Sequence, residues 1–308
     1  MVSYQDFRIR LQLLSPLGTR MTSDTLFGHL CWQVAYRQGP DGVAEFLRPF
    51  RQGQPPFVLS DAFPAGLLPK PPVPRTPSAL ARPEDYPQLK QWQKWPFLTV
   101  DDFLRLREDP SANVQPLPDP WQVAKIPHAA IDRRIDTTGT EAFAGQFFLT
   151  EVCYLPGKQI VDIYCRDFAH SLPALLQWLE QIGKTGFGRD KSVGFGQFRI
   201  LSEEPWPHFS PLPGANAVIS LSTLVPAKDD PTHGFWQLRV KHGFLGEQAS
   251  ANPFKRPMLQ LEPGAIFACP DNIPPFLGRI VPGVAPGMPE AVQCGLALTV
   301  PCRQHELL

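Results

Sequence analysis

The sequence predicts an α+β protein in which two helices pack on an antiparallel sheet. Short runs alternate apolar and polar residues, as strands with one buried face do, and two longer runs carry apolar residues at spacings of three and four, as helices do. Proline is unusually frequent, with 37 among 308 residues. Because proline fixes φ and lacks an N–H, we expect short elements, long loops and a large proline-rich insertion.

The first strand and the first helix lie near the start of the chain. Residues 7–13 alternate apolar with charged or polar side chains, which predicts a strand. Ser23 opens a run with good N-capping chemistry, apolar residues at helical spacing continue to Ala35, and Gly39 closes the run. We expect this helix to pack on the sheet.

The middle of the chain combines an insertion with two strands. Residues 53–127 are crowded with proline, which indicates an insertion packed on the surface, with a short helix within residues 89–106. Residues 147–154 and 159–165 are strand-like runs joined by a turn that contains Pro-Gly. The two runs predict a hairpin.

A second helix and a last strand follow. Apolar residues at spacings of three and four from Leu172 to Ile182 predict the helix, and Gly183 stands where a C-terminal cap is expected. Residues 194–201 predict the strand. The order strand, helix, strand, strand, helix, strand is that of the ferredoxin-like (RRM-like) fold.

Further strand-like runs after Pro205 predict a second, smaller domain. We place the first domain at residues 1–205, with its insertion at about 53–127 and a glycine-rich loop at 183–196. The second domain is placed at residues 215–308. No sequence repeat relates the two halves.

Composition limits the possible functions. Lysine plus arginine equals aspartate plus glutamate at 29 each, so any contact with a polyanion must come from a local patch. The six cysteines form no CxxC pair and no zinc-binding spacing, and we read them as reduced thiols. The sequence contains no signal-peptide pattern and no apolar run long enough to span a membrane. We therefore expect a cytoplasmic protein without a metal or cofactor.

The most informative segment is the glycine-rich loop between the second helix and the last strand. It contains five glycines and the cations Lys184, Arg189, Lys191 and Arg199. Glycines expose backbone N–H groups and cations contact phosphate, so the loop suits an RNA backbone. A plain turn with solvated charges is the alternative.

Two nucleotide motifs are excluded at this loop. Gly183-Lys184-Thr185 resembles the end of a Walker A motif, but Trp178 stands at the place of its first glycine and the segment follows a helix where a P-loop follows a strand. A dinucleotide fingerprint fails as well, because Lys191 stands at the place of its third glycine.

The sequence here resembles the RAMP superfamily of CRISPR proteins, which has a glycine-rich loop at this place in a ferredoxin-like domain. Three further segments resemble the Cas5-like subunit of type III-A (Csm) effector complexes. They are Ser-Asp-Thr-Leu-Phe-Gly at residues 23–28, Leu-Ser-Asp-Ala-Phe-Pro at 59–64 and Leu-Pro-Lys-Pro at 68–71. Together with the loop they span residues 23–196 in the order of that family. The last third of the chain matches less distinctly, and there the resemblance alone implies a second, smaller ferredoxin-like RAMP domain.

The resemblance implies a non-catalytic subunit that binds the repeat-derived 5′ handle of the guide RNA (crRNA) and joins the large signature subunit to the backbone RAMP subunit. RAMP proteins often project the segment before the hairpin toward RNA, which adds residues 128–139. Phe187 and Phe195 are candidates for base stacking or, alternatively, for anchoring the loop. The predicted RNA-binding residues are Lys184, Gly186, Phe187, Gly188, Arg189, Lys191, Ser192, Gly194, Arg133, Arg134, Ser23 and His128.

Some readings stay open. RAMP relatives include metal-independent ribonucleases with a histidine general base, for which His29 and His128 would be the candidates here. A structural assembly protein that touches no RNA is a third hypothesis, favoured by the neutral charge. Four cations in the second half either continue the basic surface of the glycine-rich loop or form ordinary charged surface. They are Arg239, Lys241, Lys255 and Arg256.

Overall fold

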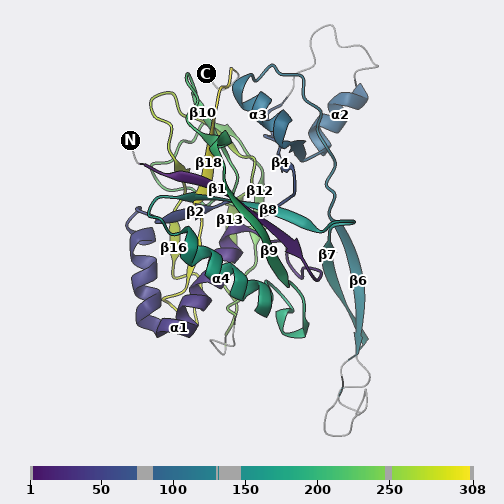
Figure 1. Ribbon diagram of the computed structural model, residues 1–308, viewed down its shortest axis with the longest axis vertical. Coiled ribbons are helices and arrows are strands. Elements are labelled where there is room, and N and C mark those ends of the chain that lie inside the picture. Colours follow the sequence, from purple (N-terminus) through teal and green to yellow (C-terminus); the bar gives the residue numbers. More distant parts are fainter. Residues whose placement is uncertain (1–2, 75–85, 130, 132–146, 247–251, 306–308) are drawn as a thin grey trace.

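The computed structural model describes residues 3–74, 86–129, 131, 147–246 and 252–305 (Figure 1). Its first sheet has the strand order β2-β8-β1-β9, and β3 also pairs with β8. The pairings are antiparallel throughout. The strands are β1 (Gln5–Leu13), β2 (Phe57–Leu59), β3 (Phe63–Pro64), β8 (Ile160–Asp167) and β9 (Phe198–Pro205).

Two helices pack against each other and against this sheet. They are α1 (Ser23–Arg51) and α4 (Leu172–Thr185). Gly39, with φ of 68°, interrupts α1 and is followed by Pro40. The predicted first helix therefore ends where expected, and a second helical stretch continues from the kink. The end of α4 differs from the prediction, because Gly183 lies inside the helix and the cap is Gly186.

The predicted hairpin of residues 147–154 and 159–165 is wrong. The strand β7 (Phe147–Tyr154) pairs with β6 (Gln122–Ala129), from Gln122 opposite Tyr154 to Ala129 opposite Phe147. The next strand, β8, is buried along almost its whole length and pairs with β1, β2 and β3 instead. The Pro-Gly turn joins β7 to β8, but the two strands do not pair. The strand β8 is more stable at the centre of the first sheet, where its apolar side chains are buried.

The predicted surface insertion also begins too early. Phe57–Leu59 and Phe63–Pro64 belong to the first sheet, although residues 53–127 were assigned to an insertion. Short apolar strands between prolines carry little periodicity, which hid them. The remaining elements of this stretch are β4 (Leu67–Pro69), which pairs with β5 (Phe97–Thr99), and the helices α2 (Tyr86–Lys94) and α3 (Val100–Glu108).

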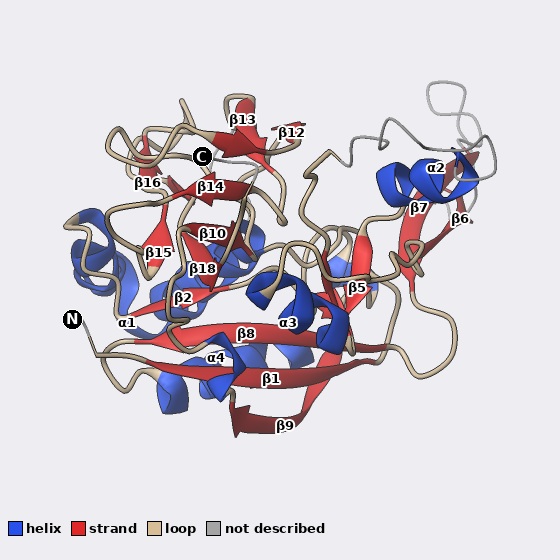
Figure 2. Cartoon of the chain, turned by 90° about the horizontal axis from the view of Figure 1, so that it is seen from above, coloured by secondary structure: helices blue, strands red, loops and turns tan. Residues whose placement is uncertain are grey.

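The second half forms another sheet, with the order β11-β14-β10-β18-β15, and two strand pairs, β12 with β13 and β16 with β17. Figure 2 shows this second sheet above the first. The strands of this sheet are β10 (Ala217–Ser220), β11 (Gly234–Phe235), β14 (Ile266–Ala268), β15 (Phe276–Leu277) and β18 (Ala297–Cys302). The strand pairs are formed by β12 (Leu238–Lys241), β13 (Met258–Leu261), β16 (Ile280–Pro282) and β17 (Val292–Cys294). Two 3-10 turns, η2 (Lys191–Val193) and η3 (Pro207–Phe209), precede the sheet in the chain.

One large hydrophobic cluster spans both halves, and a smaller cluster lies within the second half. The large cluster includes Ile9 and Ile163 from the first sheet and Leu298 and Val300 from the second. The strand β18 contacts both β2 and β8. The two sheets are therefore packed against each other. Among the described helices, none combines the length and the apolar character that crossing a bilayer requires.

Candidate nucleic-acid interface

The glycine-rich loop leaves the end of α4, passes through η2 and enters β9. Its backbone is fixed by hydrogen bonds at both ends. The Phe187 N–H donates to the Gly196 carbonyl and the Gly196 N–H donates to the Pro16 carbonyl, each at 2.9 Å. Gly196 has a φ of 73°, and a Cβ at this position would stand 2.0 Å from the Phe187 carbonyl oxygen. The sequence places glycine here because no other residue fits.

Phe187 anchors this loop in the core. Its side chain is 0% exposed, and its ring lies 4.8 Å from the His29 ring. The neighbouring Gly188 N–H donates to Nε2 of His29 at 2.9 Å. Phe187 therefore does not face solvent as a stacking platform, in agreement with the alternative that it anchors the loop. His29, on α1, holds the loop backbone through an unprotonated Nε2.

The predicted cations lie on the outside of the loop. Lys184, Arg189 and Ser192 are exposed, while Lys191 is half-buried, as are Gly188 and Gly194. Arg189 donates through Nη2 to the Glu151 carbonyl at 2.5 Å and lies 3.2 Å from Asp190 in an ion pair. These six predicted contact positions thus lie on one loop, which contacts β7 through Arg189. The predicted Gly186 is buried and shapes the loop from within.

The hairpin of β6 and β7 extends from the body of the molecule beside this loop (Figure 1). Between them is an open hollow of about 420 Å³, lined by Lys125, Glu151, Arg189 and Asp190 among others. His128 lies on β6, with its ring stacked 5.3 Å from that of Phe148. Arg133 and Arg134 lie outside the described residues.

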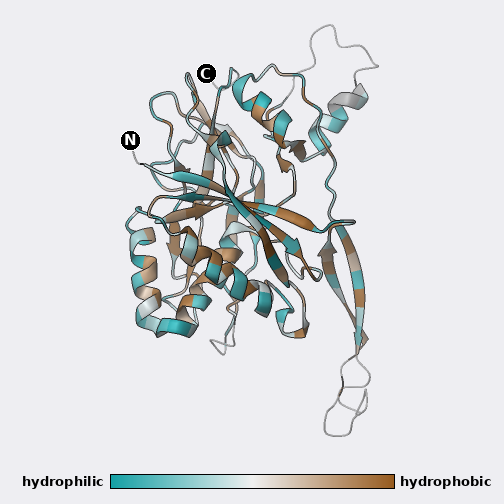
Figure 3. Cartoon of the chain, viewed as in Figure 1, coloured by the Kyte–Doolittle hydropathy of each residue, from teal (hydrophilic) through white to brown (hydrophobic). Residues whose placement is uncertain are grey.

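The same hairpin carries apolar residues, which appear as brown stretches of ribbon in Figure 3. Val123, Phe147, Phe148 and Leu149 are each at least half exposed. Exposed apolar residues gathered in this way are common where a protein meets a partner.

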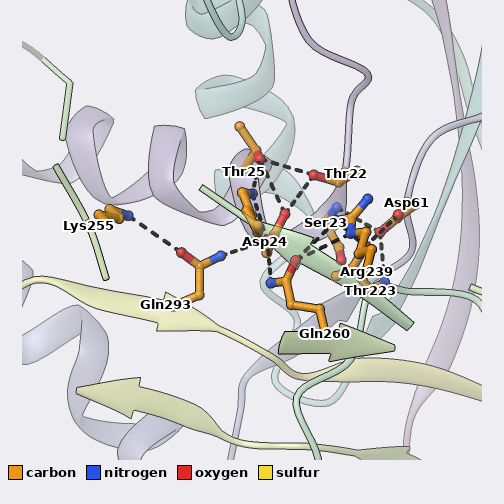
Figure 4. A network of polar contacts seen from close by, with 11 residues as sticks. Thr22, Ser23, Asp24, Thr25, Asp61, Thr223, Arg239, Lys255, Gln260 and Gln293 are labelled. Carbon is orange, nitrogen blue, oxygen red and sulfur yellow. Dashed lines mark hydrogen bonds and ion pairs between the residues drawn. The ribbon is translucent and has the colours of Figure 1, made fainter. Parts of the chain in front are cut away.

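Ser23 is buried and belongs to a polar network between the two halves of the chain (Figure 4). Its N–H donates to Oδ1 of Asp61 at 2.8 Å. Asp61 also accepts from the N–H and the hydroxyl of Thr223, at 2.9 and 2.8 Å. The Ser23 side chain is therefore not available to a ligand in this structure, and the segment 59–64 serves to join the first half to the second.

Asp24 is the centre of this network. Its Oδ2 accepts from Nζ of Lys241 at 2.7 Å, from Gln260 at 2.8 Å and from Gln293 at 2.6 Å. Arg239 donates to the hydroxyl of Thr223 at 2.9 Å. Two of the four cations considered for additional basic surface, Arg239 and Lys241, are therefore bound within the molecule. Sequence reasoning missed the network because the partners Lys241, Gln260 and Gln293 lie more than 200 residues from Asp24.

The two carboxyl groups of the network differ in their pKa. Burial alone would raise the pKa of Asp24, but the charge and hydrogen bond of Lys241 lower it to about 2. Burial raises the pKa of Asp61, and its hydrogen bonds to the N–H groups of Ser23 and Thr223 offset only part of that effect.

Asp24 predicts a loss of stability in acid. Because its pKa in the folded protein lies below the ordinary value of 3.8, its contribution is complete above pH 4 and is lost as the pH falls toward 2. We expect the free energy of unfolding to fall by about 2 kcal/mol more in this window for the wild type than for Asp24→Asn, as measured by urea unfolding. Parallel curves for the two proteins would contradict this, since Asp61 is common to both.

Within the residues that the structure describes, no group of three or more His, Cys, Asp or Glu side chains is arranged to hold a metal ion. All six cysteines are free thiols, and burial raises the pKa of Cys31 to about 12 and that of Cys269 to about 11. The thiols of Cys31 and Cys269 are therefore protonated at neutral pH.

Comparison with solved structures identifies the fold. Over 97% of its length the chain matches 99% of a chain in a crystal structure of a Csm1-Csm4 cassette in complex with cA4, with a TM-score of 0.64 and 17% identity. It matches a chain in a Csm3-Csm4 subcomplex of the type III-A CRISPR-Cas interference complex with a TM-score of 0.59 and 14% identity, over 97% of this chain and 100% of that one.

Csm4 is the subunit that both complexes contain. The fold of this chain is similar to that of the matched chains in these complexes. A further Csm1-Csm4 cassette, in complex with pppApA, matches with a TM-score of 0.62 and 17% identity over 98% of this chain and 99% of that chain. No protein-family model and no curated protein matches the sequence.

Proposed function

We propose that this chain is the Cas5-like, guide-RNA-binding subunit of a type III-A CRISPR effector complex. In the cytoplasm it binds the 5′ handle of the crRNA and joins the large signature subunit to the backbone RAMP subunit. The observation that carries the proposal is the glycine-rich loop, whose hydrogen-bonded backbone carries Lys184, Arg189 and Lys191.

The sheet order supports a ferredoxin-like assignment for the first half. In the order β2-β8-β1-β9, the neighbours β1 and β9 are the first and the last of these strands along the chain. The helix α1 follows β1 in the chain, and α4 follows β8. This is the arrangement of a βαββαβ unit when β2 supplies its second strand. The stretch between β4 and β7 is then the insertion.

The chemistry of the loop supports RNA over a purely structural role. A protein–protein interface does not require several cations next to a backbone with glycines at positive φ. An RNA strand, in contrast, offers phosphates to both the cations and the backbone N–H groups. Since the chain has no net charge, this local patch must supply the electrostatic attraction. The exposed apolar hairpin beside the loop supports contact with a neighbouring subunit.

A non-catalytic role is supported by the state of His29. A general base needs a free lone pair within reach of the substrate, and Nε2 of His29 accepts a hydrogen bond from Gly188. We therefore propose that His29 positions the loop and that cleavage of guide RNA is not its task.

Replacing Lys184, Arg189 and Lys191 together by alanine tests the proposal. We expect the affinity for guide RNA to fall about ten- to hundredfold, and the slope of log K against log salt to become shallower by about 2, because each phosphate contact on a single strand contributes about 0.7. Filter binding at several salt concentrations measures both quantities.

The matched control replaces three exposed cations far from the loop in sequence, Arg48, Lys90 and Lys228, by alanine. This variant has the same change in net charge, and we expect wild-type affinity within about twofold. An equal loss in both variants, or no loss in the loop variant while complexes still assemble, would favour the structural assembly role.

A further inference from the structure

His29 on α1 is bonded to the glycine-rich loop in a way that only a neutral imidazole allows. Its Nε2 accepts the hydrogen bond of the Gly188 N–H at 2.9 Å. A backbone N–H can only donate, so Nε2 offers a lone pair and the ring proton is on Nδ1. An imidazolium carries a proton on both nitrogens and would place one N–H against another. The contact therefore depends on the protonation state of His29.

The same ring supports the loop through a second contact. The ring centres of His29 and Phe187 lie 4.8 Å apart, and the Phe187 side chain is fully buried. The Phe187 N–H in turn donates at 2.9 Å to the Gly196 carbonyl, which closes the loop. A histidine ring that turns away from Gly188 therefore leaves a half-buried N–H without its acceptor and also withdraws packing from Phe187.

The backbone beside this contact has little freedom to adjust. A Cβ on Gly18 would stand 2.4 Å from the carbonyl oxygen of Arg189, and one on Gly188 would stand 3.4 Å from Cβ of Thr19. Residues 188 and 189 are therefore packed closely on residues 18 and 19, in addition to the bond with α1. Because close-packed segments resist small displacements, an added proton on Nε2 is accommodated by opening the loop and not by a slight shift.

The described carboxylates on the elements around this contact are paired with cations. The ion pairs are Arg189 with Asp190 in the loop at 3.2 Å, Arg20 with Asp119 at 2.7 Å, Lys241 with Asp24 of α1 at 2.7 Å, and Lys125 with Glu151 in the β6–β7 hairpin at 3.7 Å. Lys184 and Lys191 on the loop and Lys255, whose charge acts on Cys31 of α1, add further positive charge. These described groups therefore favour the neutral form of His29 over an imidazolium.

We propose that His29 is a proton switch for the glycine-rich loop. The neutral imidazole holds the loop in its ordered form, and protonation opens the loop and releases guide RNA. The inference rests on the proposed function and adds to it a regulation by pH. His29 acts as a positioning residue, because it holds the backbone that carries Arg189 and Lys191 and needs no contact with RNA itself.

The direction of the pH dependence follows from this geometry. The ordered loop binds one proton fewer than the open loop, so it is favoured above about pH 6.5, the ordinary pKa of histidine, and loses population as the pH falls below that value. We expect the affinity for guide RNA to fall about tenfold between about pH 7.5 and about pH 5.5. Simple electrostatics predicts the opposite, since protonated histidines attract phosphates more strongly in acid.

The test compares the wild type with His29→Gln by fluorescence anisotropy of handle-containing RNA bound to the full chain, over the same pH range at constant ionic strength. The glutamine amide oxygen accepts a hydrogen bond at every pH, so this variant should bind within about threefold of the wild type at neutral pH and should not lose affinity in acid. His29→Ala has no acceptor and should bind about tenfold more weakly already at neutral pH. His233→Gln replaces an exposed histidine before β11 and should keep the full pH dependence of the wild type.

NMR of the full chain with isotope-labelled histidine and glycine gives a readout that needs no RNA. At neutral pH His29 should carry its proton on Nδ1, and its protonation in acid should coincide with loss of the ordered Gly188 amide signal. A proton on Nε2 at neutral pH, protonation that leaves the Gly188 amide unchanged, or one pH profile shared by the wild type and His29→Gln would overturn the inference and leave the proposed function standing. Handle RNA that does not bind the wild type even at neutral pH would contradict the proposed function, whereas NMR still decides whether His29 controls the loop.

Discussion

Replacing Arg166 by methionine is expected to lower the free energy of unfolding by about 3–5 kcal/mol. The guanidinium is fully buried and donates to both carboxylate oxygens of Asp6, at 2.8 and 2.7 Å. It also donates to the carbonyls of Pro275 and Thr299, at 2.7 and 2.9 Å, so one side chain from the first sheet satisfies backbone groups of the second half. Methionine fills part of the space but leaves the Asp6 carboxylate buried without its partner.

Denaturant unfolding of two further variants checks the cause. The double variant Asp6→Leu with Arg166→Met removes both charges and should recover a large part of the loss, since an unpaired buried charge costs more than an apolar pair. Arg48→Met breaks an exposed pair with Glu45 and should change stability by less than about 1 kcal/mol. Equal losses from Arg166→Met and Arg48→Met would contradict the assigned role.

Replacing Gly196 by alanine is expected to disrupt the glycine-rich loop and the binding of guide RNA with it. The φ of 73° costs an alanine about 1–2 kcal/mol, and its Cβ would stand 2.0 Å from the carbonyl oxygen of Phe187, so the backbone must shift as well. We expect a total loss of more than about 2 kcal/mol. Thermal unfolding and RNA affinity measure the two effects.

Gly194→Ala provides the matched comparison within the same loop. Gly194 has a φ of 96°, but a Cβ there would meet no heavy atom within 4 Å. Its variant should show only the conformational cost and keep most of its RNA affinity. If both alanine variants bound RNA as the wild type does, the loop geometry would not matter for binding.

The elements with strong periodicity could be predicted from the sequence, and the pairing of strands could not. The alternation of residues 7–13 predicted β1, and the kink at Gly39 follows from glycine and proline chemistry. The strand β7 pairs with β6 because β8 is buried at the centre of the first sheet. That burial depends on the assembled sheet and cannot be read from the two segments alone. The short strands at residues 57–64 are too brief to show a period.

The candidate site was predicted only where it depends on local sequence. The glycine-rich loop is local, so composition alone indicated its cations and its backbone. The burial of Phe187 under His29 and the joining of Asp24 to Lys241, Gln260 and Gln293 depend on contacts between distant parts of the chain. The sequence signal for this network was Asp24 in the first turn of a predicted helix, next to apolar residues.

The most direct test of the central claim is RNA binding by the purified protein, alone and together with its large partner subunit. Guide RNA is supplied with an intact 5′ handle, with a scrambled handle or without one. The account predicts preference for the intact handle and no cleavage. Equal binding to all three RNAs would contradict it and indicate that the protein binds RNA only through charge. Handle-dependent cleavage that is lost on replacing His29 or His128 would establish the ribonuclease function instead.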